Sequence, residues 1–294
     1  MAITASMVKE LRELTGAGMM DCKKALSEVD GDMEAAIESL RKKGMAGADK
    51  KAGRIAAEGT IAIAVSADSK TAMIAEVNCE TDFVAMGDEF KTFANEIAAL
   101  ALMNDTTDVE AIMNLEMASG KTIDTTRREM VARIGENMTL RMIQKMDSTG
   151  QIGQYQHGAK IGVVVALDGG DDVLARDIAM HIAASNPAAI NADGVDQEML
   201  AKERAFQIDQ AKESGKPMAI IEKMIEGRMR KYLSDITLVG QAFVKNPDLT
   251  IEQLLKENSA TVSSFIRLEV GAGIEIEETN FADEVALAAK AVTG

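Results

Sequence analysis

The sequence of 294 residues has no tryptophan, only two histidines and only 3% aromatic residues. So few aromatic side chains leave little surface on which nucleic-acid bases or sugar rings can stack. The two histidines, His157 and His181, do not have the spacing of a metal-binding motif such as HExxH. The sequence therefore excludes a zinc hydrolase, and we expect no metal site.

Cysteine and long hydrophobic runs are also scarce. Cys22 and Cys79 have no CxxC partner, which is typical of a reducing compartment rather than of a secreted disulfide framework. The longest apolar runs, such as 161–167, are far too short to cross a membrane. Lys9 and Arg12 lie where a signal peptide would need an apolar segment. We expect a cytoplasmic protein without membrane association.

Basic residues are few, since the sequence has 32 basic and 47 acidic residues and therefore a net charge of −15. A chain this acidic repels a phosphate backbone, so the charge argues against direct binding of nucleic acid. What the sequence does contain, 47% hydrophobic and 27% charged residues, is the composition of an ordinary globular protein. Its length predicts two or three packed units.

Residues 6–44 have the hydrophobic spacing of helices, and glycines divide them into three short segments. Gly16 and Gly18 mark the first break and Gly31 marks the second. Gly44 is the predicted C-terminal stop of the third helix. We therefore expect a three-helix unit at the N-terminus.

The next segment, 41–54, contains six basic residues and one acidic residue among glycines and alanines. This composition predicts a basic linker. Two interpretations remain open, a solvated tether or a segment that docks a partner.

A β-hairpin followed by helical sequence is predicted twice. The first copy has strands and helices at 60–65, 72–77, 90–103 and 125–136. The second copy has them at 151–156, 161–167 and 171–185. A shift of 85 positions places 93–100 (FANEIAAL) on 178–185 (IAMHIAAS) with four identities. This modest match suggests an internal duplication.

A further helical region lies between Pro187 and Pro247. Its interruption at 214–217 (SGKP) is a strong turn signal, so helices at 197–213 and 218–233 are expected to pair as an antiparallel hairpin, a short coiled coil. Such a hairpin protrudes, and we expect it to contact another molecule. The residues predicted to face one another within it are Leu200, Phe206, Ile208, Ile221, Met224, Ile225 and Met229.

A final strand at 262–270 and an amphipathic helix at 281–292 complete the pattern, and the predicted fold class is α+β with antiparallel sheets. Four units are expected along the chain. They are 1–54 (three helices and linker), 55–140 (first half of the core), 141–275 (second half, with the helical hairpin inserted at about 188–238) and 276–294 (C-terminal helical module).

No combination of residues predicts a catalytic centre. A GxSxG motif is absent, and Gly16-Ala17-Gly18 lies between two helices instead of after a strand, where a phosphate-binding loop would begin. His157 is expected in a hairpin turn without an Asp or Ser nearby, which favours a surface or contact residue over a general base. His181 is expected in an apolar helix as a packed core residue.

The segment 81–85 (TDFVA) lies between a buried strand and a helix, and loops at such junctions often carry function. From the residues alone, a structural role is favoured, in which Thr81 or Asp82 caps the helix and Phe83 packs in the core. The alternative is that Phe83 is an exposed wedge that fills a partner's pocket, with Asp82 as the charged group beside it.

Several motifs resemble those of a known family. Residues 15–26 (TGAGMMDCKKAL) and 76–85 (EVNCETDFVA) closely resemble the two signature sequences of bacterial translation elongation factor Ts. Residues 155–158 (YQHG) and 265–267 (FIR) are similar to the family's hairpin turn and late strand. The resemblance runs in order along the whole chain.

This resemblance implies a guanine nucleotide exchange factor for the translational GTPase elongation factor Tu, with no enzymatic reaction and no cofactor of its own. It also implies a ubiquitin-associated-like three-helix domain, a duplicated core, an inserted helical hairpin and a tail. The hairpin is a feature of the longer family members, which bind one GTPase molecule, so a 1:1 heterodimer is implied.

The resemblance also implies which residues bind the GTPase. In the family, the segment that matches Thr81, Asp82, Phe83 and Val84 inserts beside the GTPase's magnesium site, which favours the wedge over the core interpretation. The helical hairpin is implied to engage the other side of the partner. Further contact residues implied by the match are Met19, Met20, Lys23, Ile134, Gly135 and His157.

Two other functions compete with exchange. The alternative is a non-catalytic adaptor that binds another protein through the three-helix domain and uses the core as a scaffold. An adaptor has no need of Asp82-Phe83 at a strand-to-helix junction, so this junction distinguishes the two functions. A third hypothesis is a hydrolase that uses His157 as its base.

Overall fold

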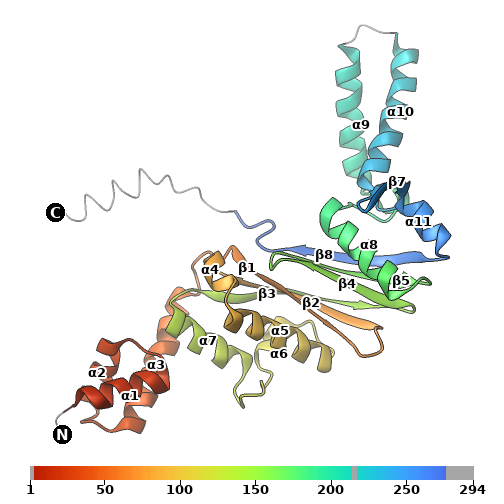
Figure 1. Cartoon of the computed structure of the whole chain (residues 1–294). Coiled ribbons are helices and arrows are strands. Elements are labelled where there is room, and N and C mark those ends of the chain that lie inside the picture. The colour runs from red at the N-terminus through yellow and green to blue at the C-terminus, as the bar shows by residue number, and fades with distance from the viewer. Residues whose placement is uncertain (1–2, 214–216, 276–294) are drawn as a thin grey trace.

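The computed structural model describes residues 3–213 and 217–275. The predicted unit 276–294, with its helix at 281–292, lies outside the described residues, as do residues 214–216 of the predicted turn. The described chain has an α+β fold with antiparallel sheets, as predicted. Figure 1 shows two sheets at the centre, a three-helix unit at one end and a helical hairpin at the other.

The N-terminal unit contains three helices that pack around a small core of their own. They are α1 (Ala5–Thr15), α2 (Met19–Glu28) and α3 (Met33–Lys51). The side chains of Thr4 and Asp32 cap α1 and α3 by accepting hydrogen bonds from first-turn amides. Gly16 ends α1 in the left-handed conformation, with φ 68°.

The third helix is longer than predicted, because α3 continues through Gly44 to Lys51. The predicted stop at Gly44 and the solvated tether over 41–54 are therefore wrong. Ala48 is 1% exposed and packs into the core beneath the first sheet. This burial helps to offset the cost of about 1 kcal/mol for each of the two glycines inside the helix, Gly44 and Gly47. A helix, and not a tether, joins the three-helix unit to the core.

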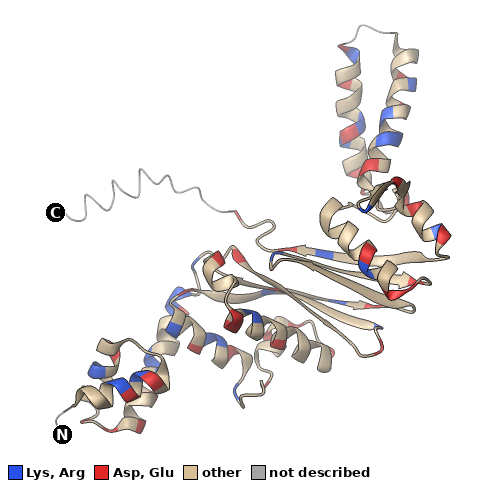
Figure 2. Ribbon diagram, in the orientation of Figure 1, with Lys and Arg blue, Asp and Glu red and all other residues tan. Residues whose placement is uncertain are grey.

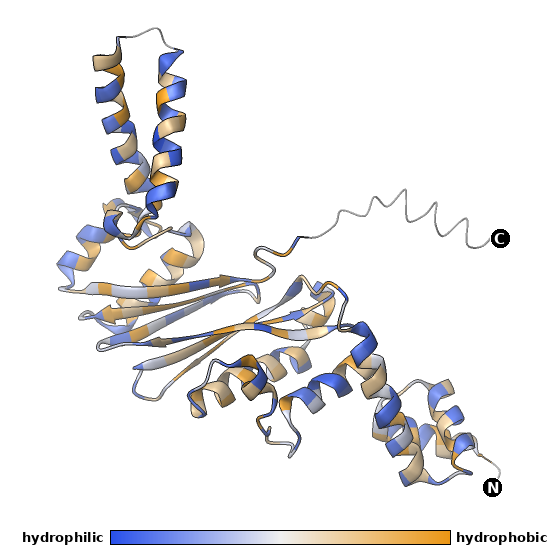
Figure 3. Ribbon diagram, turned by 180° about the vertical axis from the view of Figure 1, so that it is seen from behind, coloured by the Kyte–Doolittle hydropathy of each residue, from blue (hydrophilic) through white to orange (hydrophobic). Residues whose placement is uncertain are grey.

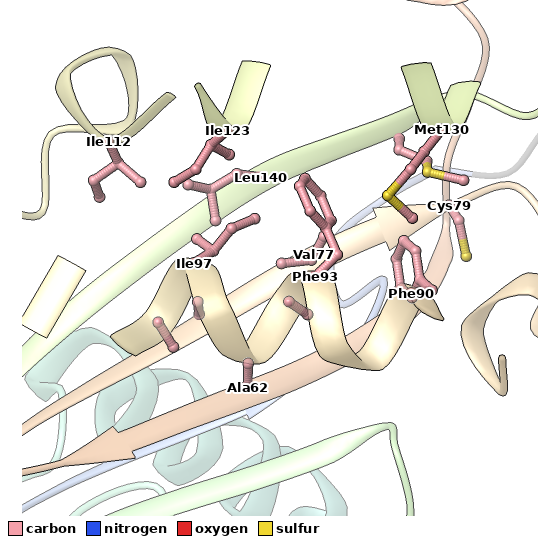
Figure 4. Packing of buried hydrophobic residues seen from close by; sticks show 14 of the residues in the cluster. Ala62, Val77, Cys79, Phe90, Phe93, Ile97, Ile112, Ile123, Met130 and Leu140 are labelled. Carbon is pink, nitrogen blue, oxygen red and sulfur yellow. The ribbon is translucent and has the colours of Figure 1, made fainter. Parts of the chain in front are cut away.

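The first half of the core is a three-stranded antiparallel sheet covered by helices. Its elements are β1 (Glu58–Val65), β2 (Thr71–Cys79), α4 (Asp82–Ala85), α5 (Asp88–Met103), α6 (Val109–Met113), α7 (Ile123–Ile134) and β3 (Met138–Asp147). The strand order is β1-β2-β3. Met73 and Val77 of β2 point toward the helices, while Ala72 and Ile74 point toward the second sheet. Figure 4 shows side chains of α5, α6 and α7 packed onto the helical side of this sheet.

Strand β3 was not predicted from the sequence, because a β-bulge hides its alternation. Leu140 and Ile143 both pack toward the helices although they lie three residues apart. The register shifts opposite Glu76 and Val77 of β2, which leaves Arg141 without a paired residue. A simple period of two is therefore absent from this segment.

The second half of the core has the same connectivity as the first. Its sheet is formed by β4 (Gln151–His157), β5 (Ile161–Asp168) and β8 (Thr261–Glu269), and α8 (Asp172–Ser185) covers it. In both halves, the second strand of a hairpin is the central strand and a third strand returns later in the chain. This arrangement is the one that a duplication would produce. The elements inserted between α8 and β8 are η1 (Ala192–Gly194), α9 (Gln197–Lys212), α10 (Met218–Ile236), β6 (Ala242–Phe243), β7 (Asn246–Thr250) and α11 (Ile251–Glu257).

The two sheets pack face to face, so that the helices of each half lie on the outside (Figure 1). Ile61 and Ile74 of the first sheet and Val164 of the second lie in the buried layer between them. Gly162 permits this close packing, because a β-carbon there would collide with Ile61. The Ile61 amide also donates a hydrogen bond to the Ala159 carbonyl at 2.8 Å. The first sheet therefore lies directly against the β4–β5 turn.

The helical hairpin of α9 and α10 extends away from the sheets, as predicted (Figure 1). Ile208, Ile221, Ile225 and Met229 pack between its helices, as expected. Phe206 is 60% exposed, so its predicted position between the helices is wrong. Figure 3 shows hydrophobic residues interspersed with hydrophilic ones along both helices.

Acidic and basic side chains are mixed on the helices of both ends of the molecule (Figure 2). Within residues 3–213 and 217–275, no helix is both long enough and apolar enough to cross a membrane.

Candidate protein-docking site

The loop after β2 presents an aromatic side chain to solvent. Its centre is the single turn α4, whose N-cap Thr81 accepts a hydrogen bond from the Val84 amide at 3.4 Å. Val84 and Ala85 face the core, while Phe83 is 85% exposed. Successive helical residues point about 100° apart, so a single turn cannot bury all three side chains. Thr81 caps the single turn α4 and not the predicted helix, since α5 begins after Gly87 without a side-chain cap. The predicted cap of that helix and the predicted burial of Phe83 are therefore both wrong.

A carboxylate beyond the end of α7 holds this loop in place. Glu136 Oε2 accepts hydrogen bonds from the amides of Glu80 (3.2 Å) and Thr81 (3.0 Å), and Glu136 Oε1 accepts one from Thr81 Oγ1 (2.6 Å). Hydrogen bonds to a charged acceptor are stronger than neutral ones. Sequence reasoning missed Glu136, because its partners lie more than 50 residues earlier and no local spacing connects them.

A second set of hydrogen bonds joins the same loop to the start of β3 and to the chain before β1. Glu80 Oε1 accepts from the Asn137 amide at 2.6 Å and from Arg54 Nη1 at 3.4 Å. Arg54 also donates to the Gly135 carbonyl at 3.4 Å. The predicted contact residues Ile134 and Gly135 therefore lie beside the predicted loop 81–84, as the end and the C-cap of α7.

Cys79 supports the base of the loop without being reactive. Its buried thiol donates a hydrogen bond from Sγ to the Thr81 carbonyl at 3.2 Å. Burial, assisted by the negative charge of Glu136, raises the pKa of the Cys79 thiol to about 12. The thiol stays protonated at neutral pH, which is the state that donates to the carbonyl.

The β4–β5 turn lies on the other side of the loop. Lys160 of this turn forms an ion pair with Glu58 at 2.9 Å, and Glu58 pairs with Cys79 in the first sheet. The hydrogen bond to Glu58, together with the nearby charge of Asp82, raises the pKa of Lys160. The turn that carries His157 is thereby placed next to the start of the loop.

His157 is exposed at the end of β4, and its ring Nδ1 lies 3.4 Å from Tyr155 Oη. Tyr155 is not the carboxylate that would orient a catalytic base. The geometry favours the predicted contact role and gives no support to the hydrolase hypothesis.

The predicted contact residues on the three-helix unit form a separate surface. Met19 and Met20, in the first turn of α2, are 59% and 75% exposed, and Lys23 is exposed one turn later. Leu14, at 62% exposure, adds a further apolar side chain at the end of α1. The predicted contact residues therefore include two separate exposed apolar groups, one on α2 and one at Phe83.

His181 lies outside this site, as predicted. It is fully buried in α8, and burial lowers its pKa. Within the part of the chain that the structure describes, no group of three His, Cys, Asp or Glu residues is arranged to hold a metal ion.

The chain is similar to known proteins along its whole length. The family model described as elongation factor TS matches residues 80–272. The elongation factor Ts of Hydrogenovibrio crunogenus is 72% identical over 294 residues, which covers all of both chains. That of Methylococcus capsulatus is 57% identical over 286 residues, or 97% of this chain and 98% of its own. That of Thioalkalivibrio sulfidiphilus is 55% identical over 292 residues, or 99% of each chain.

Proposed function

The chain belongs to the elongation factor Ts family, and from this premise we propose that this translation elongation factor promotes GDP release from the GTPase elongation factor Tu. The exposed side chain of Phe83 is the observation that carries the proposal. A phenylalanine that is 85% exposed contributes little to the core, whereas aromatic side chains are common anchors in protein interfaces.

Phe83 is also presented in a fixed position. Glu136 accepts three hydrogen bonds from the loop, and Glu80 of the loop accepts one from the Asn137 amide. A rigid anchor loses little conformational entropy on binding, so more of its contact energy remains to act on the partner. We infer that the segment of Thr81, Asp82, Phe83 and Val84 inserts next to the magnesium site of the GTPase through Phe83 and Asp82, while Val84 faces the core and anchors the turn.

Disturbing that magnesium site weakens nucleotide binding, because the ion bridges the GTPase and the phosphate oxygens of GDP. Binding of the factor and binding of GDP are then negatively coupled, and each weakens the other by the same ratio. A thousandfold acceleration of release requires about 4 kcal/mol more stabilisation of the release transition state than of the GDP complex. A few buried contacts supply energy of this size.

The remaining predicted contacts extend the same interface. Ile134, Gly135 and His157 flank the loop, whereas Met19 and Met20 form an adaptable apolar contact on the three-helix unit, with Lys23 beside them. The helical hairpin reaches the other side of the GTPase in a 1:1 complex. We propose the predicted units 1–54, 55–140, 141–275 and 276–294 as the division of the chain, with the boundary at 140 moved to the end of β3 because all of β3 belongs to the first sheet.

The factor acts by exchange and is not an enzyme, because no covalent bond is made or broken. It needs no cofactor, and we propose that it acts in the cytoplasm, where its GTPase partner would be. The adaptor alternative explains the exposed Met19 and Met20 but leaves the held and exposed Phe83 without a role.

The test is the release of fluorescent GDP from purified elongation factor Tu, with and without this protein, at several magnesium concentrations. We expect acceleration that saturates with added factor and that shrinks as magnesium is removed, because the factor then has less metal binding to disturb. No acceleration by a folded protein would overturn the exchange function and leave the adaptor function in its place.

A further inference from the structure

Helix α3 belongs to two hydrophobic cores. Its first half contributes Ala36 and Leu40 to the core of the three-helix unit, and its second half contributes Ala48 to the core beneath the first sheet. A helix of 19 residues spans about 28 Å. Because no break separates the two halves, the direction of α3 decides where the three-helix unit lies.

α3 lies against α7, and Gly44 is a point of close approach. A β-carbon on Gly44 would lie 2.9 Å from the β-carbon of Ala132, well inside the distance at which two carbons attract. At Gly47, one turn later, a β-carbon would meet nothing within 4 Å. Of these two glycines, Gly44 alone is required for the observed docking.

The ion pairs between these helices are weak. Arg41 pairs with Glu129 at 3.5 Å, and Asp49 pairs with Arg128 at 3.5 Å. Ion pairs with this much solvent exposure are worth about 1 kcal/mol or less. A cleft of about 850 Å³ opens between the three-helix unit and α7, so the unit is fixed by α3 and by the close approach of Arg133 of α7 to Gly16. The approach at Gly44 is the backbone contact within α3 that a single added methyl would disturb.

The same C-terminal end of α7 that carries Ala132 also supports the Phe83 loop. Gly135 caps the helix, and Glu136 immediately after it holds the Thr81 backbone. Met19 and Met20 are thus connected to α7 through α3, and Phe83 is connected to α7 through Glu136.

We propose that Gly44 is a positioning residue that lets α3 dock on α7 and so holds Met19 and Met20 at a fixed separation from Phe83, such that both groups contact one GTPase molecule at once. The proposal rests on the exchange function proposed above. Two contacts held in a matching geometry bind one target more tightly than either alone, because the second contact forms within the complex. A changed docking loses this advantage although every contact residue is unchanged.

The first test measures the docking itself, without the GTPase. Spin labels on the exposed variants Glu10→Cys in α1 and Asn95→Cys in α5 report the distance between the three-helix unit and the core, because the two native cysteines are buried. Gly44→Ala should shift or broaden the distance distribution, since the added methyl meets Ala132. Gly47→Ala is the matched control and should leave the distribution unchanged.

The second test measures exchange. Gly44→Ala should raise the factor concentration for half-maximal GDP release by about tenfold, the advantage lost when two contacts no longer act together. Gly47→Ala should stay within about twofold of the wild type, although both variants remove a helical glycine. Ala132→Gly added to Gly44→Ala moves the methyl from α7 to α3, and it should restore both the distance and the half-maximal concentration.

The proposal is overturned if Gly44→Ala matches Gly47→Ala in either measurement, or if Ala132→Gly restores neither. A wild-type protein that does not accelerate GDP release overturns the exchange function instead. The distance measurement then still decides whether Gly44 sets the docking.

Discussion

The two halves of the core differ where the central strand leads into the outer helix. In the second half this junction has three residues, 169–171. Gly169 and Gly170 turn the chain with φ values of 78° and 68°, and Asp171 caps α8 by accepting from the Leu174 amide at 2.8 Å. The helix begins at once, and no loop rises above the sheet.

In the first half the same junction has eight residues, 80–87. The additional length forms the single turn α4 and places Phe83 in solvent. Glu136, which follows α7, accepts a hydrogen bond from the Thr81 amide and so holds the turn. The second half also exposes an apolar residue after its junction, Val173 at 67%, but it lies directly on α8. The comparison indicates that the first half differs from the second in two features of the same strand-to-helix junction. These are the additional turn α4, which exposes Phe83, and Glu136, which fixes that turn.

The largest expected effect comes from removing the aromatic side chain of the longer junction. Phe83→Ala should slow factor-stimulated GDP release by tenfold or more, because a desolvated aromatic anchor is commonly worth about 2 kcal/mol or more. The melting temperature should not change, since Phe83 contributes little to the core. Stopped-flow release of fluorescent GDP and a thermal melt are the two measurements.

Val173→Ala is the matched control, because it truncates the exposed apolar residue of the shorter junction. It should leave GDP release unchanged. Equal losses in Phe83→Ala and Val173→Ala would show that the raised turn has no special role. A large fall in the melting temperature of Phe83→Ala would restore the structural interpretation of that side chain.

A smaller effect is expected from releasing the turn while Phe83 is kept. Glu136→Ala removes the acceptor of three hydrogen bonds and should slow stimulated release by about three- to tenfold, because the anchor must then be ordered on binding. Glu136→Gln keeps one carbonyl acceptor and should give an intermediate loss. Hydrogen exchange at the amides of Glu80 and Thr81 should quicken in the same order.

Glu96→Ala provides the control for this prediction. Glu96 Oε1 accepts from the Ala118 amide at 2.9 Å and so holds a different loop of the same half. Its removal should free that loop without an effect on GDP release. Faster amide exchange in Glu136→Ala with unchanged release would show that Phe83 needs no preorganised loop.

Much of the fold was predictable because its signals are local. Helix spacing, glycine breaks and hairpin turns involve residues close together in the sequence, and they predicted both hairpins of strands and the α9–α10 pair. The second half of α3 was mispredicted because Gly44 and the surrounding basic residues conceal the burial of Ala48, which depends on the first sheet. Strand β3 was missed for a similar reason, since its bulge at Arg141 is visible only opposite β2.

The candidate site, like the fold, was predictable only where it depends on residues close together in the sequence. Thr81 has the residue type of a helix cap, but it caps the single turn α4, which the sequence did not predict, and not α5. The exposure of Phe83 does not follow from the segment itself, because it depends on Val84 and Ala85 facing the core. The role of Glu136 depends on chain topology that brings the end of α7 back to β2. The residues named for partner contact remain a prediction, which Phe83→Ala tests for the loop.

The last prediction concerns equivalent positions on the two outer helices and does not involve exchange. The shift of 85 residues pairs Glu96 of α5 with His181 of α8. His181 donates from Nε2 to Gln241 Oε1 at 3.0 Å and accepts at Nδ1 from the Val244 amide at 3.4 Å. This pair of bonds requires a neutral ring, and burial lowers the pKa of His181 below its usual 6.5.

At pH values between the lowered pKa of His181 in the folded protein and 6.5, the folded protein therefore binds fewer protons at His181 than the unfolded chain does. The corresponding stability is fully present above pH 6.5 and is lost as the pH falls toward the lower, folded pKa. Amide exchange in α8, corrected for its intrinsic pH dependence, should quicken relative to α5 between pH 7.5 and about 5.5. His181→Gln should remove this difference and leave GDP release at pH 7.5 unchanged. An equal response in His181→Gln and the wild type would assign the pH dependence to carboxylates instead.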